Sequence, residues 1–386
     1  MDYLPEKNIS LIKINIEYYF LFIITALLLA TGIVMVSSAS MPFGESYYND
    51  SFYFIKKEII WSVISIIVLF IFSKIDYHKI AKISNFIMLI SIFLLIIVLI
   101  PGIGKEVGGA RRWINFPFIG IQPSEFAKIA VIIYLSNYFD KKNKDIDKIK
   151  TVILPPLVFI LLITILIFIE PDFSVGVTIW IIVFILMFVG GVRFKHLLSI
   201  IFGWAVLSVS FLFLENYRAE RIMSFLNKTN EITGSNFQIS QSLIALGSGS
   251  IFGVGFGNSL QKYSYLPEAN TDFIFSIIGE EFGLIGTLFV IILFILFAYI
   301  GIRIALKAQD YVGKLITIGI TSLVTIQAII NILVTIGAVP VTGMALPFIS
   351  MGGSSLVSTM IGVGIVLNIS KYKVYSTEEK EKWVSE

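Results

Sequence analysis

The chain has 386 residues, of which 56% are hydrophobic and 14% charged, with a net charge of +3. Its mean hydropathy of +0.89 excludes an ordinary soluble globular protein and predicts a polytopic membrane protein. The small net charge gives no reason to expect a nucleic-acid partner. The absence of cysteine excludes disulfides and thiolate catalysis, and the two histidines, His78 and His196, lie beside basic loop residues, which argues against a histidine metal centre.

Ten apolar runs are long enough to cross a bilayer, which takes about 17–25 residues. They lie near residues 17–38, 54–73, 81–100, 122–139, 152–169, 173–191, 197–214, 273–300, 312–337 and 350–369. The first run is longer than the apolar core of a signal peptide, so we interpret it as an uncleaved span. The predicted fold class is an all-α polytopic membrane protein with about ten transmembrane helices and one long extracellular loop, about 215–272, between spans 7 and 8.

The distribution of basic residues predicts the orientation. Most of the 29 lysine and arginine residues lie in the tails and in the alternate loops on the side of the termini. By the positive-inside rule, both termini are expected in the cytoplasm. The loop at 101–121, the turn at 170–172 and the long loop then face outward, where no nucleotide is available. Chemistry there needs a substrate that is already activated.

Lys128 is a costly charge about 9 Å inside a predicted span, and Glu125 lies three residues earlier on the same helical face. The lysine is either a snorkelling side chain paired to Glu125 or a cation held for an anionic headgroup. Arg111 and Arg112, beside Trp113, offer guanidinium groups suited to phosphate. Such an interfacial basic loop also serves as a generic lipid-headgroup contact.

Glu170 and Asp172 flank Pro171 at the junction of two predicted spans. Paired carboxylates coordinate divalent cations or shift each other's pKa, and they also occur as simple interfacial turn residues. We therefore treat Glu170 and Asp172 as candidate metal ligands, with the turn-residue alternative left open.

The long loop contains a predicted helix over residues 237–247 that would lie at the membrane surface. Several glycines follow between 247 and 257, and we interpret them as a re-entrant or hinge segment that admits a bulky lipid-linked substrate. No strand precedes them, so they do not match a phosphate-binding glycine loop.

Asp272 ends the loop, with Asn270 or Thr271 as the expected N-cap of the following span. The helix dipole would weaken the Asp272 carboxylate as a base, whereas the apolar surroundings near Phe273 would strengthen it. Asp272 is thus either an ordinary first-turn acid or a catalytic base. Glu280 and Glu281 lie deeper in the same span, where carboxylates usually pair or serve a polar cavity.

Several motifs together resemble the SEDS family of bacterial membrane proteins, whose members FtsW and RodA polymerise peptidoglycan glycan strands. The matching residues are GARRWI at 109–114, QPSEFAK at 122–128, EPD at 170–172, QS at 241–242, LPE at 266–268, TDFIF at 271–275, LPFIS at 346–350 and GGSS at 352–355. Residues 241–249 and 258–269 look more like the division member, although residues 340–343 also occur in RodA-like members. Asn270 and Met351 depart from the histidine and tyrosine that are common in the family.

The resemblance implies a single SEDS-type domain over residues 1–386, in the bacterial inner membrane, with the active site on the outer face. It implies an inverting glycosyltransferase that uses lipid II as donor and acceptor, with Asp272 as general base. The candidate substrate-binding residues are Arg111, Arg112, Lys128, Glu125, Gln241, Glu268 and Lys262. A divalent cation, Mg²⁺ or Mn²⁺, is a candidate cofactor at Glu170 and Asp172, and no nucleotide is expected.

The partners that the resemblance implies are lipid II, a class B penicillin-binding protein with transpeptidase activity, and other membrane proteins of division or elongation. Two alternatives remain open. A lipid II flippase would use the intramembrane charges Lys128, Glu280 and Glu281 along a translocation path. A division scaffold would have no catalysis of its own.

Overall fold

The computed structural model describes residues 16–107, 110–116, 119–142, 152–213, 234–263 and 265–371. Ten helices in these ranges correspond to the ten predicted spans. They are α1 (Ile16–Tyr48), α2 (Tyr53–Lys74), α4 (Ser84–Leu99), α5 (Pro123–Lys142), α6 (Leu154–Ile169), α7 (Phe173–Val189), α8 (Phe194–Phe213), α11 (Ile274–Leu306), α12 (Tyr311–Thr335) and α13 (Gly353–Ser370). The chain is a multi-pass membrane protein of about ten spans, as predicted.

Five of these helices, α1, α8, α11, α12 and α13, are long and apolar enough to cross a membrane by length and composition. α4, α6 and α7 are apolar but have 16 or 17 residues. The 22-residue α2 and 20-residue α5 carry lysine and glutamate. At about 1.5 Å per residue, each of these last two still extends about 30 Å, the thickness of a bilayer core.

The structure adds one element to the predicted all-α fold. Residues 101–121, expected as a loop, contain an antiparallel sheet of β1 (Gly104–Val107), β2 (Ala110–Phe116) and β3 (Ile119–Ile121). Arg111 pairs in register with Glu106, and Trp113 with Lys105. Arg112, which lies between these two pairs, has no partner on β1, because the register shifts between Lys105 and Glu106. The sheet fixes the direction in which the two arginines point.

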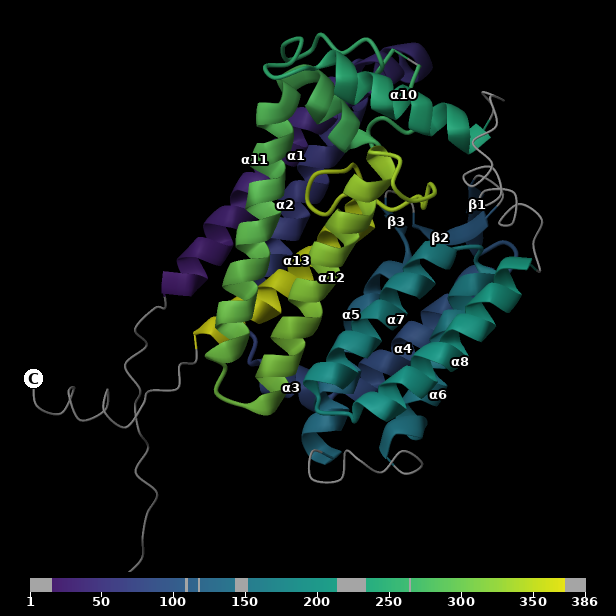
Figure 1. Cartoon of the computed structure of the whole chain (residues 1–386), viewed down its shortest axis with the longest axis vertical. Helices are drawn as coiled ribbons and strands as arrows, with labels where there is room; N and C mark the ends of the chain where they lie inside the picture. The colour runs from purple at the N-terminus through teal and green to yellow at the C-terminus, as the bar shows by residue number, and fades with distance from the viewer. Residues whose placement is uncertain are drawn as a thin grey trace, which may run out of the picture.

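The connections divide between two ends of the bundle (Figure 1). The sheet, α10 (Gly234–Ser248) and the segment 338–352 lie at one end, whereas α3 (Tyr77–Lys82) and the α11–α12 connection lie at the other. The start of α1 and the end of α13 also meet at that second end, where the Lys371 ammonium lies 5.4 Å from the Tyr18 ring centroid. The described parts of the loops that were predicted to face outward therefore lie at the first end. Residues 1–15, 143–151, 214–233 and 372–386 lie outside the described part.

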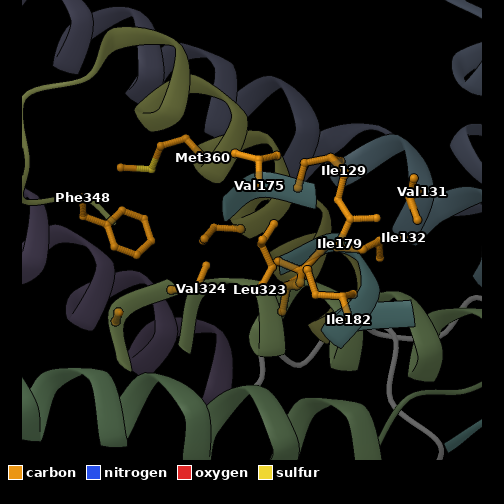
Figure 2. Close-up of a cluster of buried hydrophobic side chains, with 14 of the residues drawn as sticks. Ile129, Val131, Ile132, Val175, Ile179, Ile182, Leu323, Val324, Phe348 and Met360 are labelled. Carbon is orange, nitrogen blue, oxygen red and sulfur yellow. The ribbon is translucent and has the colours of Figure 1, made fainter. Parts of the chain in front are cut away.

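The centre of the bundle is built from α5, α7 and α12. Ile129 and Ile132 of α5, Ile179 of α7 and Leu323 of α12 are among its buried side chains, shown in Figure 2. A Cβ on Gly319 of α12 would lie 2.5 Å from the Ile132 side chain, so glycine there allows the two helices to approach closely. α8, in contrast, lies at the periphery, because only 11% of its residues Phe194–Phe211 are buried. The central helices are also those that carry the polar residues described below.

α11 is broken at Gly283, which has φ 63° and ψ −156°. The segment 249–262 packs into this break: Val254 N–H donates to the Glu280 carbonyl, and Leu284 N–H donates to the Ser250 carbonyl. A Cβ on Gly253 would lie 2.2 Å from the Glu281 carbonyl. The glycines expected to form a hinge therefore serve close backbone approach, because only glycine leaves room for it.

Candidate active site

Asp272 lies just before α11, not in its first turn. Phe273 is the N-cap and α11 begins at Ile274, so the expected caps at Asn270 and Thr271 are wrong. The Glu268 carbonyl instead accepts hydrogen bonds from the N–H groups of Thr271 and Phe273, each at 3.2 Å. Asp272 is therefore placed by a tight turn whose backbone bonds replace a side-chain cap.

The segment 338–352, between α12 and α13, holds the Asp272 turn from the other side. The Asn331 amide on α12 donates to the backbone carbonyls of Asp272, at 2.8 Å, and Met344, at 2.7 Å. A Cβ on Gly343 would lie 3.6 Å from Asp272 Oδ2, so the Gly343 backbone flanks the carboxylate. With φ +71°, this position also favours glycine for its backbone conformation.

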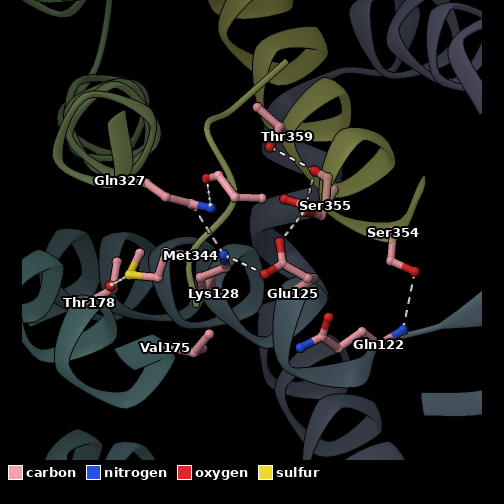
Figure 3. A network of polar contacts seen from close by, with 12 residues as sticks. Gln122, Glu125, Lys128, Val175, Thr178, Gln327, Met344, Ser354, Ser355 and Thr359 are labelled. Atoms are coloured by element: carbon pink, nitrogen blue, oxygen red, sulfur yellow. Dashed lines mark hydrogen bonds and ion pairs between the residues drawn. The ribbon is translucent and has the colours of Figure 1, made fainter. Parts of the chain in front are cut away.

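Lys128 lies in a buried polar network near this segment, shown in Figure 3. Its Nζ donates to Glu125 Oε1 at 2.8 Å and to Gln327 Oε1 at 3.2 Å, and Lys128 is only 2% exposed. The Gln327 amide in turn donates to the Ala345 carbonyl. The pair of Lys128 with Glu125, which is one of the two alternatives left open by the sequence, is thus present. Because Gln327 and Asn331 are four residues apart on α12, they share a face and connect this network to the Asp272 turn.

Gln122 connects the same network to the carboxylates of the α6–α7 turn. Its amide donates to Asp172 Oδ2 at 3.2 Å, and its backbone N–H donates to Ser354 Oγ at 3.1 Å. Arg112 covers the turn from the sheet, donating to the carbonyls of Glu170 at 3.0 Å and Pro171 at 2.7 Å. Residues separated by more than two hundred positions in the sequence are therefore brought together at one end of the bundle.

Glu170 is the most unusual group in this region. Both of its carboxylate oxygens are buried and have no hydrogen-bond partner among the described residues. Burial, with the neighbouring Asp172 carboxylate, raises the pKa of Glu170 to about 9 despite the opposing influence of Arg112. Burial also raises the pKa of Asp172. Asp172 accepts hydrogen bonds from Gln122 and Val175, so only the Glu170 oxygens lack partners among the described residues, and hard carboxylate oxygens of this kind are the donors that Mg²⁺ and Mn²⁺ prefer. Within the described ranges, no group of three or more histidine, aspartate or glutamate side chains is arranged to hold a metal ion.

The remaining candidate residues are more dispersed. Arg111 pairs with Glu106 at 3.2 Å on the exposed side of the sheet. Gln241 lies on α10, which is fastened by the hydroxyl of its neighbour Ser242 to Ser276 and to the Thr335 carbonyl, both at 2.6 Å. Glu268 lines a surface cavity together with Thr271.

Lys262 lies in a second buried network, distinct from that of Lys128. Its Nζ donates to Glu281 Oε1 and Ser38 Oγ, each at 2.9 Å, and to the Gly257 carbonyl at 2.6 Å. Glu280 accepts from the Ser259 hydroxyl and the Leu260 N–H. These contacts fix the segment 249–262 to α1 and α11. The intramembrane charges that would line a flippase path are thus divided between two separate networks.

Sequence reasoning missed Gln327 and Asn331, which carry the link between Lys128 and Asp272. Both lie within α12, whose 25 residues are otherwise largely apolar, and both are buried. Two amide side chains four residues apart in an apolar span are a readable signal, because polar groups at that depth need partners. The spacing alone does not identify those partners.

Comparison with known proteins gives a consistent result. The family model for the cell cycle proteins FtsW, RodA and SpoVE matches residues 19–375. Stage V sporulation protein E of Bacillus subtilis is 42% identical over 357 residues, covering 92% of this chain and 97% of its own. A probable peptidoglycan glycosyltransferase FtsW of Geobacter metallireducens is 39% identical over 369 residues, covering 94% and 97%.

Solved structures share the fold. One chain of a peptidoglycan synthase complex, described as coordinating polymerization and crosslinking, aligns with a TM-score of 0.74 and 23% identity, covering 91% of this chain and 97% of its own. The rod shape determining protein RodA of Thermus thermophilus aligns with a TM-score of 0.68 and 23% identity, covering 92% and 97%.

Proposed function

Because the chain belongs to the family of FtsW, RodA and SpoVE cell cycle proteins, we propose that it is a peptidoglycan glycosyltransferase that extends glycan strands from a lipid-linked donor. Its similarity to a probable FtsW over nearly its whole length makes it an FtsW-like member of the SEDS family, and we assign it to division rather than elongation. The observation that carries the assignment of the site is the convergence of α5, α12 and the segment 338–352 on the Asp272 turn.

The proposed reaction joins two lipid II-derived sugars at the outer face. The Asp272 carboxylate takes the proton of the acceptor 4-hydroxyl as that oxygen attacks the donor anomeric carbon with inversion. The bond from this carbon to the lipid pyrophosphate breaks, and the pyrophosphate leaves with the electron pair. Such a step needs a positioned base and stabilisation of the leaving-group charge.

Arg111, Arg112 and Lys128 are the cations proposed to stabilise the pyrophosphate. Arg112 is oriented by the Glu170 and Pro171 carbonyls, and a guanidinium also offers further N–H donors to phosphate oxygens. Glu125 and Gln327 hold Lys128 in a fixed position, where its charge acts without a change in geometry. Gln241 and Glu268 are also proposed to bind substrate. Lys262, the third such candidate, would act indirectly, by holding the segment 249–262 in place.

Glu170 and Asp172 are proposed to hold a divalent cation, which would supply further charge stabilisation for the pyrophosphate. The buried, unpartnered oxygens of Glu170 support this proposal. Adding Mg²⁺ should raise the melting temperature of the protein but not that of Glu170→Gln, and an equal rise in both would exclude this site.

A flippase is the second candidate function, and the geometry favours it less. Glu281 is paired with Lys262, and Glu280 is bound by the Ser259 hydroxyl and backbone N–H groups, so the structure gives these charges internal partners. A class B penicillin-binding protein remains the proposed partner. The functional test is a glycan-strand gel with purified protein and lipid II, with and without that partner. Asp272→Asn should give no polymer, whereas Asp140→Asn, at the opposite end of the bundle, should match the wild type.

A further inference from the structure

A cavity of about 300 Å³ opens beside the Asp272 turn. One wall comes from the corner between α1 and α2, and the other from Glu268, Asn270, Thr271 and Met351. Its volume is at the lower end of the range of small-molecule sites, about 300–1,000 Å³. Each wall has a distinct chemistry, aromatic on one side and polar on the other.

The aromatic wall is formed by rings that are already arranged by contacts with one another. Phe43 and Tyr47 stack with centroids 6.4 Å apart and planes within 9°. Tyr48 stacks on Tyr53 at 3.7 Å and meets Phe54 edge-on at 5.6 Å. Tyr47 nevertheless remains 76% exposed. Flat rings held in place and open to solvent suit the apolar C–H face of a pyranose ring, since such contact buries apolar surface without ordering long side chains.

The polar wall offers hydrogen-bonding groups for hydroxyls. Glu268 has φ 56°, a conformation unusual outside glycine, and its carboxylate accepts the Thr271 hydroxyl at 2.8 Å. Strained backbone of this kind is often found at functional sites. Because the single Thr271 O–H is donated to Glu268, the lone pairs of this pair remain to accept hydrogen bonds from sugar hydroxyls. Among the described residues, no lysine or arginine lines the cavity, so the chemistry of this lining does not suit a pyrophosphate.

The two departures from the family pattern meet in this same cavity. The Asn270 amide lies 3.7 Å from Met351 Sδ, and the Met351 N–H donates to the Asn270 carbonyl at 3.0 Å. Both residues line the cavity. Asn270 and Met351 therefore contribute to the shape and polarity of this pocket.

The cavity is coupled to the candidate base through a single turn. The Glu268 carbonyl accepts the N–H groups of Thr271 and Phe273, the two neighbours of Asp272. From this geometry we propose that the cavity is a sugar subsite that holds one N-acetylhexosamine unit of the glycan next to the reacting centre. The proposal rests on the proposed function and adds the place where the carbohydrate, rather than the pyrophosphate, is recognised.

The test uses lipid-free chitotetraose as a probe of the full-length protein. Tyr47→Ala and Glu268→Gln should each weaken chitotetraose binding by about three- to tenfold, the value of one ring or hydrogen-bond contact. Tyr47→Phe should bind as the wild type because it retains the ring. Tyr19→Ala, which removes an exposed tyrosine at the other end of α1, is the matched control. Unchanged binding in both Tyr47→Ala and Glu268→Gln would overturn the proposal.

Polymerisation assays then distinguish the two sources of the sugar. If the unit belongs to the growing strand, Tyr47→Ala shortens the strands while the lipid II KM stays constant. If it belongs to the incoming lipid II, the KM rises. If Tyr47→Ala loses co-purification with the proposed transpeptidase partner but still binds chitotetraose as the wild type does, the cavity is a protein contact. That result would overturn the proposal. Because chitotetraose binding is measured without turnover, it tests the subsite even if Asp272→Asn retains activity and the proposed function fails.

Discussion

The side-chain amide of Asn331 donates a 2.8 Å hydrogen bond to the backbone carbonyl of Asp272. The same amide nitrogen also donates to Met344, so one buried residue joins α12, the Asp272 turn and the segment 338–352. The position of the candidate base therefore depends on a residue that we do not expect to touch the reacting atoms.

Replacing Asn331 tests this positioning role. Asn331→Leu should lower kcat about tenfold or more and leave the lipid II KM nearly unchanged, because a small displacement of a base slows chemistry without removing binding contacts. Asn137→Leu is the matched control, since Asn137 is a buried amide bonded to Ser84 near the other end of α5. A rise in KM with constant kcat would contradict the positioning role.

Lys128 distinguishes a substrate cation from a structural ion pair. Lys128→Met should raise the donor concentration required as well as lower the rate, because the pyrophosphate loses a fixed charge. The double variant Lys128→Met with Glu125→Gln removes the unpaired buried carboxylate that the single change leaves behind. It should recover thermal stability but not donor affinity. Unchanged donor dependence in both variants would show that the pair is structural.

The Lys262 network predicts a stability effect. Lys262 and Glu281 have side chains 3% and 0% exposed. Lys262→Met leaves an unpaired buried carboxylate and should destabilise the protein by about 3–5 kcal/mol. Adding Glu281→Leu should recover most of this loss. The melting temperature of each variant is measured by heating samples and following the folded fraction by size-exclusion chromatography. A Lys262→Met variant as stable as the wild type would refute the stabilising role of the Lys262–Glu281 pair.

The contacts of His78 predict a pH-dependent contribution to stability. His78 lies at the end of the bundle where α1 begins and α13 ends. Its ring lies between Asp76 Oδ1 at 2.8 Å and Asp310 Oδ2 at 2.7 Å. Partial burial opposes the charged ring, but the two carboxylates outweigh it and raise the pKa of His78. Because the folded-state pKa lies above the usual value of about 6.5, the stabilisation is fully present below that value and is lost as pH rises through the folded pKa.

The corresponding measurement compares melting temperatures of the wild type and His78→Gln from pH 5 to 9. The advantage of the wild type should be largest near the acid end of this range and should decrease above about pH 6.5. A difference that is constant with pH would show that the His78 contribution does not depend on its charge.

Much of the fold could be predicted because each span is an apolar run of bilayer length. The sheet at residues 104–121 was missed because its strands are short, and a register is set by pairing rather than by composition. Likewise, the break at Gly283 depends on a segment some thirty residues earlier that supplies Gly253. Nothing in the local sequence of α11 specifies that contact.

The site was predictable in part for a related reason. Glu125 and Lys128 lie one turn apart, so helical spacing alone predicted their contact. The bonds from Gln327 to Lys128 and from Asn331 to Asp272 join separate helices, and only the packed structure brings them together. Similarly, the aromatic cavity combines the corner after α1 with a turn more than two hundred residues later.

The most direct test of the account is the amount of glycan polymer formed from lipid II by purified wild-type protein and by Asp272→Asn, each with the proposed transpeptidase partner and at equal folded concentration. The account predicts polymer from the wild type and none from Asp272→Asn, with unchanged melting temperature. Substantial polymer from Asp272→Asn would contradict the assignment of Asp272 as the general base.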